Sequence, residues 1–207
     1  MSFFENFISS GDPDLDSLLK FTAEIDKMTS VFRRTLLLDR SRAENDAEHS
    51  WHIAVMALIF EKYASEKVNV QHAVEMLLVH DLVEIYAGDT FAYDTAGNSD
   101  KAAREQTSAD KLFSMLDNEH GTHLRNLWEE FDKRESPDAK YANCMDRIQP
   151  FLHNILTSGH TWRNGTNLPV RRQVEERMQI VRDFMPEVCI WIEKSIAVAV
   201  NKKWLAE

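Results

Sequence analysis

Cysteine is scarce in this chain of 207 residues, which contains only Cys144 and Cys189. Neither has a CxxC neighbour, so the sequence excludes a disulfide framework, and we expect both thiols to be inert parts of the core. The opening residues MSFFENFISSGD lack the basic start and the apolar run of a signal peptide. No stretch approaches the roughly 18 uninterrupted apolar residues that a membrane span needs. We therefore expect a cytoplasmic protein with no membrane partner.

Glycine and proline are also few, with six and five residues. Apolar residues recur at spacings of three and four over most of the length, a pattern typical of amphipathic helices, and no strand pair is predicted. A chain of 207 residues, 43% of them hydrophobic, is long enough for one large domain with its own core and too short for two domains of ordinary size. We predict an all-α fold class, with one helical bundle over residues 1–207.

Polar connections separate the predicted helices. The first begins near Asp12, with Pro13 in its first turn, and residues 91–100, FAYDTAGNSD, have the composition of a loop. Pro150 is expected to kink or interrupt its helix. Further helices are expected at about residues 49–64, 71–87, 100–118, 121–134, 137–158, 169–184 and 186–204.

An excess of positive charge is absent as well, since the formal net charge is -10. This argues against a general surface for a nucleic-acid polymer. An anionic substrate would have to be met by local cations, such as a metal ion and a few arginines.

One apolar segment carries unexpected charge. Residues 77–90 read LLVHDLVEIYAGDT, in which His80, Asp81, Glu84 and Asp89 lie among residues that look buried. A buried charge costs several kcal/mol unless it is paired or bound to a cation. On a continuous helix, His80 and Glu84 would share one face and Asp81 would be turned by roughly 100°. Histidine with carboxylate suits Mn, Fe, Co, Ni or Zn better than calcium, so the segment predicts a metal site.

Two residues elsewhere are candidates to complete such a site. His49 begins an apolar helix in DAEHSWHIAVMALIF, and Asp146 lies in YANCMDRIQPFL. A single helical histidine is more often a hydrogen-bonded core residue than a ligand, so no one of these residues is persuasive alone. His52 fits packing better than ligation and is left out of the metal set. The other histidines have no carboxylate at ligand spacing and are expected to be structural or exposed: His72, His120, His123, His153 and His160.

Taken together, these residues resemble a known family. The order His49, then His80-Asp81, then Asp146 is similar to the HD-domain superfamily of metal-dependent phosphohydrolases. The segments ENDAEHSWHIA and LLVHDLVEIYAGD are particularly similar to the branch of the 5'-deoxynucleotidases. The resemblance covers about residues 15–160 and implies an HD-type helical bundle with the metal held between helices. Helices over about residues 169–204 would pack on this core.

The resemblance also implies roles for individual residues. His49, His80, Asp81 and Asp146 would bind one divalent metal ion, which could be Mn, Co, Zn, Fe, Ni or Mg. Glu84 and Asp89 would move protons, and which of them is the proton donor is left open. The resemblance places an arginine that clamps the phosphate closest to Arg34, with Arg33 beside it, and a planar guanidinium suits bidentate phosphate binding. Dinuclear members have extra histidines between the HD pair and the last aspartate, the interval in which His120 and His123 lie.

One departure concerns the substrate. The nucleotidases have an aromatic residue directly after the arginine, whereas Thr35 follows Arg34 here. Large aromatics such as Trp51, Trp128 and Trp162 are more typical of the core than of base stacking. The preference for deoxyribose is therefore not predicted.

We expect a metal-dependent phosphohydrolase that releases phosphate from a small phosphomonoester, most plausibly a nucleoside 5'-monophosphate. Two alternatives stay open: hydrolysis of a larger nucleotide, such as a nucleoside triphosphate or an alarmone, and a non-catalytic metal-binding scaffold or sensor. The resemblance points to a homodimer, and the apolar C-terminal segment IWIEKSIAVAV offers a surface for it.

Overall fold

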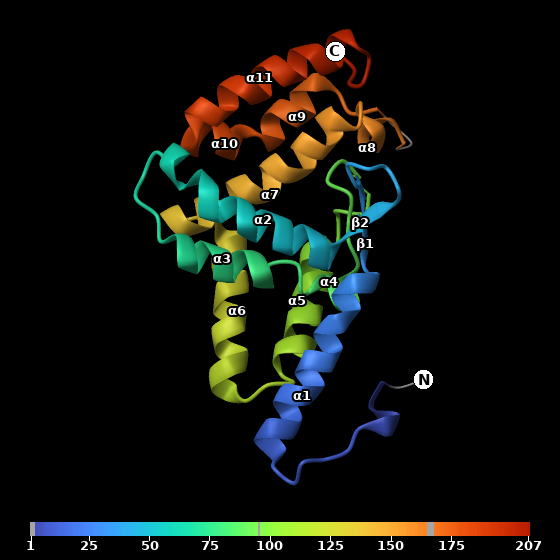
Figure 1. The fold of residues 1–207 in the computed structure, drawn as a ribbon, viewed down its shortest axis with the longest axis vertical. Helices are drawn as coiled ribbons and strands as arrows, with labels where there is room; N and C mark the ends of the chain where they lie inside the picture. Colours follow the sequence, from blue (N-terminus) through green and yellow to red (C-terminus); the bar gives the residue numbers. More distant parts are fainter. Residues whose placement is uncertain (1–2, 95, 165–167) are drawn as a thin grey trace.

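The computed structural model describes residues 3–94, 96–164 and 168–207. Helices dominate it, which confirms the all-α fold class (Figure 1). The C-terminal helices lie at one end of the molecule, and the N-terminal helix lies at the other end with two helices from the middle of the chain. The main helices are α1 (Pro13–Ile25), α2 (Asp46–Phe60), α3 (Val70–Val79), α4 (Glu84–Ala87), α5 (Lys101–Phe113), α6 (Asn118–Lys133), α7 (Pro137–Leu156), α8 (His160–Arg163), α9 (Arg171–Arg177), α10 (Gln179–Phe184) and α11 (Pro186–Asn201).

Local sequence explains several helix starts. Asp12 caps α1 by accepting hydrogen bonds from the backbone N–H groups of Asp14 and Leu15, and Ser136 caps α7 in the same way. Asn45 and Glu48 form a reciprocal capping box at the start of α2. The predicted starts at Pro13 and Pro137 are therefore confirmed.

A short antiparallel ribbon between α1 and α2 corrects the prediction that no strands pair. Strand β1 (Phe32–Leu36) pairs with β2 (Ala43–Asn45), and an irregularity in the register lies between Phe32 and Leu36. The ribbon leads directly into α2, so residues of β1 are held close to the first turn of that helix.

The core is formed where α2, α3 and α7 pack against one another, with α6 on the outer side of α3 (Figure 1). Fully buried side chains such as Ile53, Leu77 and Met145 come from these three helices. The arrangement brings the start of α2, the end of α3 and the middle of α7 together, although they are far apart in the chain. Cys144 and Cys189 are free and buried, as predicted.

The predicted helix over residues 71–87 is not continuous. It ends at Val79, and the chain passes through tight turns with i to i-3 hydrogen bonds, such as Leu82 N–H to Val79 O, before α4 begins. The carbonyl of Leu77 would accept the amide of Asp81 in a continuing helix. It instead accepts a hydrogen bond from Nδ1 of His80 at 2.8 Å, and this side-chain competition with the backbone explains the break.

The C-terminal half differs from the prediction in two respects. Of the two effects expected of Pro150, a kink or an interruption, the interruption is absent, because α7 continues to Leu156. The helix expected at about residues 169–184 is two short helices, α9 and α10, separated at Met178, and Val170 before them forms an isolated bridge with Ala206. None of the helices in the described ranges combines the length and apolar composition that crossing a membrane requires.

Candidate active site

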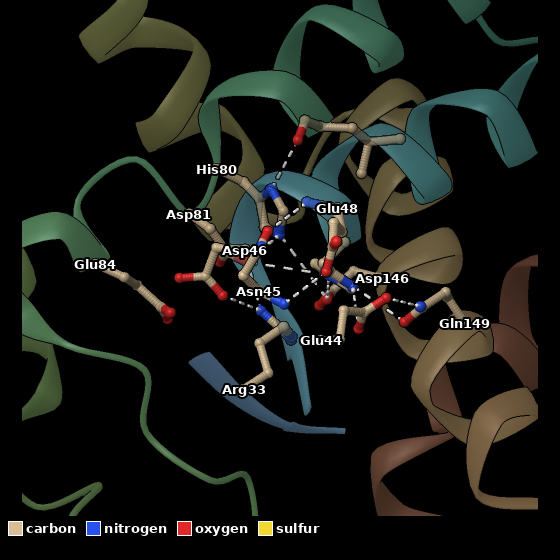
Figure 2. Close-up of polar contacts among 12 residues, drawn as sticks. Arg33, Glu44, Asn45, Asp46, Glu48, His80, Asp81, Glu84, Asp146 and Gln149 are labelled. Carbon is tan, nitrogen blue, oxygen red and sulfur yellow. Dashed lines mark hydrogen bonds and ion pairs between the residues drawn. The ribbon is translucent and has the colours of Figure 1, made fainter. Parts of the chain in front are cut away.

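Four side chains converge between three segments of the helical core. His49 comes from the first turn of α2. His80 and Asp81 come from the turn after α3, and Asp146 comes from the middle of α7 (Figure 2). Nε2 of His49 lies 3.1 Å from Oδ1 of Asp146, and Nε2 of His80 lies 3.0 Å from Oδ2 of Asp81. The structure thus brings together all four residues that the sequence predicted as metal ligands.

The ring of His49 is held by a residue that the sequence reasoning missed. Nδ1 of His49 lies 3.0 Å from Oε1 of Gln149, while Nε2 of Gln149 donates to Oε1 of Glu44 at 2.6 Å. Because the glutamine oxygen can only accept, His49 must carry its proton on Nδ1 and present a lone pair at Nε2. Burial, together with the positive charge of Arg33, lowers the pKa of His49 to about 4, so the ring is neutral at pH 7.

His80 is fixed in the same tautomer. Its Nδ1 donates to the Leu77 carbonyl, so the neutral ring has its lone pair on Nε2. That buried nitrogen has no hydrogen-bond partner among the described residues, although Oδ2 of Asp81 lies 3.0 Å away and Oδ1 of Asp146 3.9 Å away. A lone pair that faces carboxylate oxygens with nothing between them is unfavourable unless a proton or a cation joins them.

A divalent metal ion fits this donor set. Ligand atoms of His49, His80 and Asp81 all lie within 4.8 Å of one another, and the three residues are buried. In the absence of a cation, Asp81 outweighs burial and raises the pKa of His80, which favours its protonated ring. Burial opposes ionisation of Asp81, yet this charge on His80 and that of Arg33 outweigh it and hold the pKa of the carboxyl well below its usual range. A bound metal ion would take the place of the proton on His80. Two neutral imidazoles and two ionised carboxylates are ligands that suit a first-row transition metal.

Arg33, and not Arg34, is bound to the acidic cluster. Nη1 of Arg33 lies 2.6 Å from Oδ2 of Asp81 and 3.2 Å from Oδ1 of Asp46 (Figure 2). Arg34 is exposed, and its guanidinium lies 4.6 Å from the ring centroid of Phe91. Both arginines line the same pocket. Arg33 pairs with two acids, whereas Arg34 forms no ion pair with an acid among the described residues.

Glu84 and Asp89 lie beside the cluster: Glu84 begins α4, and Asp89 lies two residues after its end. Glu84 is 2% exposed, its Oε2 has no hydrogen-bond partner in the described chain, and its Oε1 lies 3.4 Å from Nζ of Lys101. Burial and the charges of Asp81 and Asp46 raise the pKa of Glu84 well above its ordinary value. Burial also raises the pKa of Asp89, which is less enclosed. Both shifts favour the protonated carboxyl, and the shift of Glu84 is the larger.

The cluster opens into a pocket with a volume of about 500 Å³. This volume is in the range of pockets that bind small molecules. His80, Asp81 and Asp146 line it, together with Glu84 and Asp89. Its walls carry aromatic side chains, namely Phe91, Tyr93, Trp128, Phe131, Phe151 and Trp162. Trp128 and Trp162 are buried as predicted, whereas Trp51 is 66% exposed, so its prediction as a core residue was wrong.

Three residues of the site were missed because their roles depend on contacts across the fold. Glu44 and Asp46 lie in the acidic run ENDAE directly before His49, and Gln149 lies about one helical turn after Asp146. The only sign of their roles in the sequence is therefore that they lie close to a predicted metal ligand. His52, which was left out of the predicted metal set, is not in the group formed by His49, His80 and Asp81; its Nδ1 lies 3.3 Å from Nε2 of Gln149.

The remaining histidines are not part of the cluster. His120 and His123 are exposed on α6 and do not line the pocket, so they are not placed to bind a second metal there. His153 was expected to be structural or exposed, and it is buried: its Nδ1 donates to the Leu36 carbonyl at 3.1 Å, and its Nε2 accepts from Nε2 of Gln149 at 3.1 Å.

Comparison with known proteins gives consistent matches. A model of the HD domain family matches residues 25–189. The chain is 26% identical over 160 residues to the 5'-deoxynucleotidase HDDC2 of Danio rerio, with 77% of this chain and 76% of that protein covered. It is 27% identical over 137 residues to the 5'-deoxynucleotidase HDDC2 of Homo sapiens, with 66% of each covered.

Solved structures extend these matches. A predicted metal-dependent phosphohydrolase from Magnetospirillum magnetotacticum is 39% identical, with a TM-score of 0.88 over 97% of this chain and 100% of that one. An HD-domain phosphohydrolase from Listeria innocua has a TM-score of 0.58 at 18% identity, over 92% of this chain and 90% of that one, and shares the fold.

Proposed function

Because the chain belongs to the HD domain family and is a phosphohydrolase, we propose that it hydrolyses a nucleoside 5'-monophosphate with a divalent metal ion held by His49, His80, Asp81 and Asp146. The observation that carries this proposal is a concentration of unsatisfied buried polar atoms. Of the seven such side-chain atoms in the described residues, five belong to Arg33, Glu44, Asp46, His80 and Glu84. Buried polar atoms are normally paired, so an unpaired group of them indicates a site prepared for a ligand.

Phosphate-ester hydrolysis needs an activated water, cationic groups that neutralise the negative charge on the phosphoryl oxygens, and a proton for the leaving oxygen. A divalent ion, when bound, lowers the pKa of water and polarises the phosphoryl group. Arg33 keeps Asp81 ionised and oriented, because its Nη1 contacts the Oδ2 atom. Arg34 is free to contact the phosphate, since its guanidinium has no acidic partner in the part of the chain that is described.

We assign protonation of the leaving oxygen to Glu84, with Asp89 as the second acid at the pocket wall. Glu84 is the more deeply buried, and its Oε2 atom is unpaired. A carboxyl group in such surroundings retains its proton near neutral pH and can donate it. Asp89 has closer access to solvent and lines the pocket beside Thr90.

The aromatic walls support a nucleoside as the leaving group. Thr35 stands where the nucleotidases have an aromatic residue, but Phe91 packs against Arg34 from the loop after α4. Phe91 and Tyr93 contact each other edge to face, with ring centroids 5.4 Å apart, and both line the pocket. Aromatic faces of this kind can stack on a base regardless of its identity.

The test is release of inorganic phosphate from ribo- and deoxyribonucleoside monophosphates. Protein stripped of metal would be assayed after Mn, Co, Zn or Mg is restored, beside Asp81→Asn and the control Asp183→Asn, which changes an exposed aspartate on α10. We expect metal-dependent release that is lost only in Asp81→Asn. Tight metal binding with no release from any monophosphate would reject the proposal.

Two expectations about organisation remain proposals. We propose that residues 1–207 form one domain and that the chain is a homodimer. In support of an association surface, Ile190, Trp191 and Val198 of α11 are 55%, 37% and 45% exposed. Light scattering after size-exclusion chromatography would test the dimer, and a monomer at micromolar concentration would contradict it.

A further inference from the structure

Three arginines line the end of the pocket that lies beyond Asp146. Arg134 ends α6, Arg147 follows Asp146 in α7, and Arg177 is the last residue of α9. All three also line a neighbouring pocket of about 440 Å³, whereas none of the four candidate metal ligands does. The arginines therefore lie where the two pockets adjoin, and Arg147 contacts Oδ2 of Asp146, whereas His49 and His80 approach its Oδ1.

The positive charge of this group is largely unpaired. Nη1 of Arg147 lies 2.6 Å from Oδ2 of Asp146. Neither Arg134 nor Arg177 forms a side-chain hydrogen bond or an ion pair within residues 3–94, 96–164 and 168–207. Among the acids that share these walls, Glu105 pairs with Lys101 at 3.0 Å and Glu176 pairs with Arg172 at 3.4 Å. Asp132, which offsets part of the charge of Arg134, is exposed.

The chain as a whole has an excess of acid, with 34 acidic residues and 24 basic ones, so three arginines around two adjoining pockets form a local concentration of positive charge. Their proximity is unfavourable in the absence of an anion. Burial and the charge of Arg147 lower the pKa of Arg177 to about 10, and burial and Arg147 also lower the pKa of Arg134. A bound anion would relieve this repulsion, and planar guanidiniums are well suited to phosphate.

We propose that Arg134, Arg147 and Arg177 form a subsite for a second phosphate, so that the substrate is a phosphomonoester of a nucleotide that carries another phosphate group. This rests on the proposed function, because it assumes that the first phosphate lies at the metal cluster. The pocket of about 500 Å³ reaches from Glu84 and Asp89 at one side to Arg134 and Arg177 at the other, which leaves room for a nucleoside between the two phosphates.

The test is the ratio of kcat/KM between substrates with two phosphates and with one. Metal-loaded protein would be assayed with a nucleoside 5'-monophosphate, the matching 3',5'-bisphosphate and the matching 5'-diphosphate, whose adjacent phosphates have no nucleoside between them. The wild type should prefer the 3',5'-bisphosphate, and a preference for the 5'-diphosphate instead would contradict a nucleoside lying between the two phosphates. In Arg177→Gln this preference should fall about tenfold. The matched control is Arg171→Gln, on the same helix, where Arg171 pairs with Glu175 at 2.7 Å outside both pockets. It should keep the preference within about twofold.

A binding measurement separates this inference from the proposed function. The dissociation constant of inorganic pyrophosphate should rise about tenfold in Arg177→Gln and stay near the wild-type value in Arg171→Gln. If pyrophosphate binding depends on Arg177 while no nucleotide is hydrolysed, the subsite stands and the proposed function fails. An equal loss of kcat/KM for the monophosphate and the bisphosphate would overturn the inference, because the arginines would then bind the reacting phosphate. Pyrophosphate binding that is independent of Arg177 would also overturn it.

Discussion

Nδ1 of His49 lies 3.0 Å from Oε1 of Gln149, and this contact joins two residues that are 100 positions apart in the chain. The amide of Gln149 is oriented by Glu44, which accepts from its Nε2 at 2.6 Å. The orientation leaves Nε2 of His49 unprotonated and directed toward Asp146. Groups that fix the tautomer of a metal-binding histidine commonly contribute as much to metal affinity as a weaker ligand does.

Replacement of Gln149 by leucine should therefore weaken metal binding by about 10- to 100-fold, because His49 becomes free to rotate and to change tautomer. Calorimetric titration of metal-free protein with Mn or Co measures the affinity directly. The control is Gln179→Leu, since Gln179 is exposed and pairs only with Asp183 within the described chain. Unchanged affinity in a folded Gln149→Leu protein would show that His49 needs no such support.

Arg33 and Arg34 should respond differently to substitution by methionine. Arg33→Met leaves Asp46 and Asp81 without their buried counter-charge, so the free energy of unfolding of the metal-free protein should fall by about 3–5 kcal/mol. Arg34→Met removes an exposed guanidinium, so stability should change by less than about 0.5 kcal/mol while KM rises. Urea unfolding and steady-state kinetics measure the two effects. A larger loss of stability in Arg34→Met would contradict the assignment.

The metal cluster could be predicted from the sequence because its signal is chemical. An adjacent histidine and aspartate in an apolar segment need a partner for their charge in any backbone conformation. The order of His49, His80-Asp81 and Asp146 then matches one family. The same reasoning could not show which arginine would be paired, since neighbouring residues of a strand point to opposite faces and the strand itself was not predicted.

The break between α3 and α4 could not be predicted for a different reason. Apolar spacing is nearly the same in a continuous helix and in a helix followed by a tight turn. The turn depends on one hydrogen bond from His80 to the Leu77 carbonyl, which spacing does not reveal. The ribbon of β1 and β2 is likewise too short to give an alternating pattern, and its register is irregular.

Glu84→Gln should lower kcat by about 10²- to 10⁴-fold, since glutamine keeps the shape of the side chain and lacks a proton to transfer. Asp89→Asn should have a smaller effect, because Asp89 is less buried. Metal content would be measured in both variants by elemental analysis. If Glu84→Gln loses metal in proportion to activity, Glu84 is a ligand and the assignment as proton donor is wrong.

Removal of the metal should destabilise the protein, because the lone pairs of His49 and His80 would again face carboxylates without a cation. Metal at 100 times its dissociation constant adds about 2.7 kcal/mol to the free energy of unfolding. Thermal unfolding with and without a chelator measures this difference, and Tm should recover when Mn or Co is restored. In Asp81→Asn the chelator should have little effect. A chelator-induced shift of equal size in that variant would place the metal elsewhere.

Glu24 provides a pH-dependent contribution to stability at the junction of α1 and α4. It is 3% exposed and accepts hydrogen bonds from Lys27 and from the hydroxyl of Tyr86, which lies two residues after Glu84. Burial opposes ionisation of Glu24, but the hydrogen bonds from Lys27 and Tyr86 outweigh it and lower its pKa. A carboxyl whose pKa is lower in the folded state stabilises the protein above its unfolded pKa of about 4.3, and this stabilisation is lost as pH falls through the folded value.

Glu24→Gln should therefore reduce the free energy of unfolding by about 1–3 kcal/mol at pH 7, and the difference from the wild type should shrink toward zero below about pH 4. Urea unfolding across this range measures it, with Glu66→Gln, which changes an exposed glutamate between α2 and α3, as the control. If the difference in the free energy of unfolding between Glu24→Gln and the wild type is constant with pH, Glu24 stabilises α4 through the packing of its side chain and not through its charge. If the difference follows the lowered pKa, the charged carboxylate anchors α4, and with it the position of Glu84 at the pocket wall.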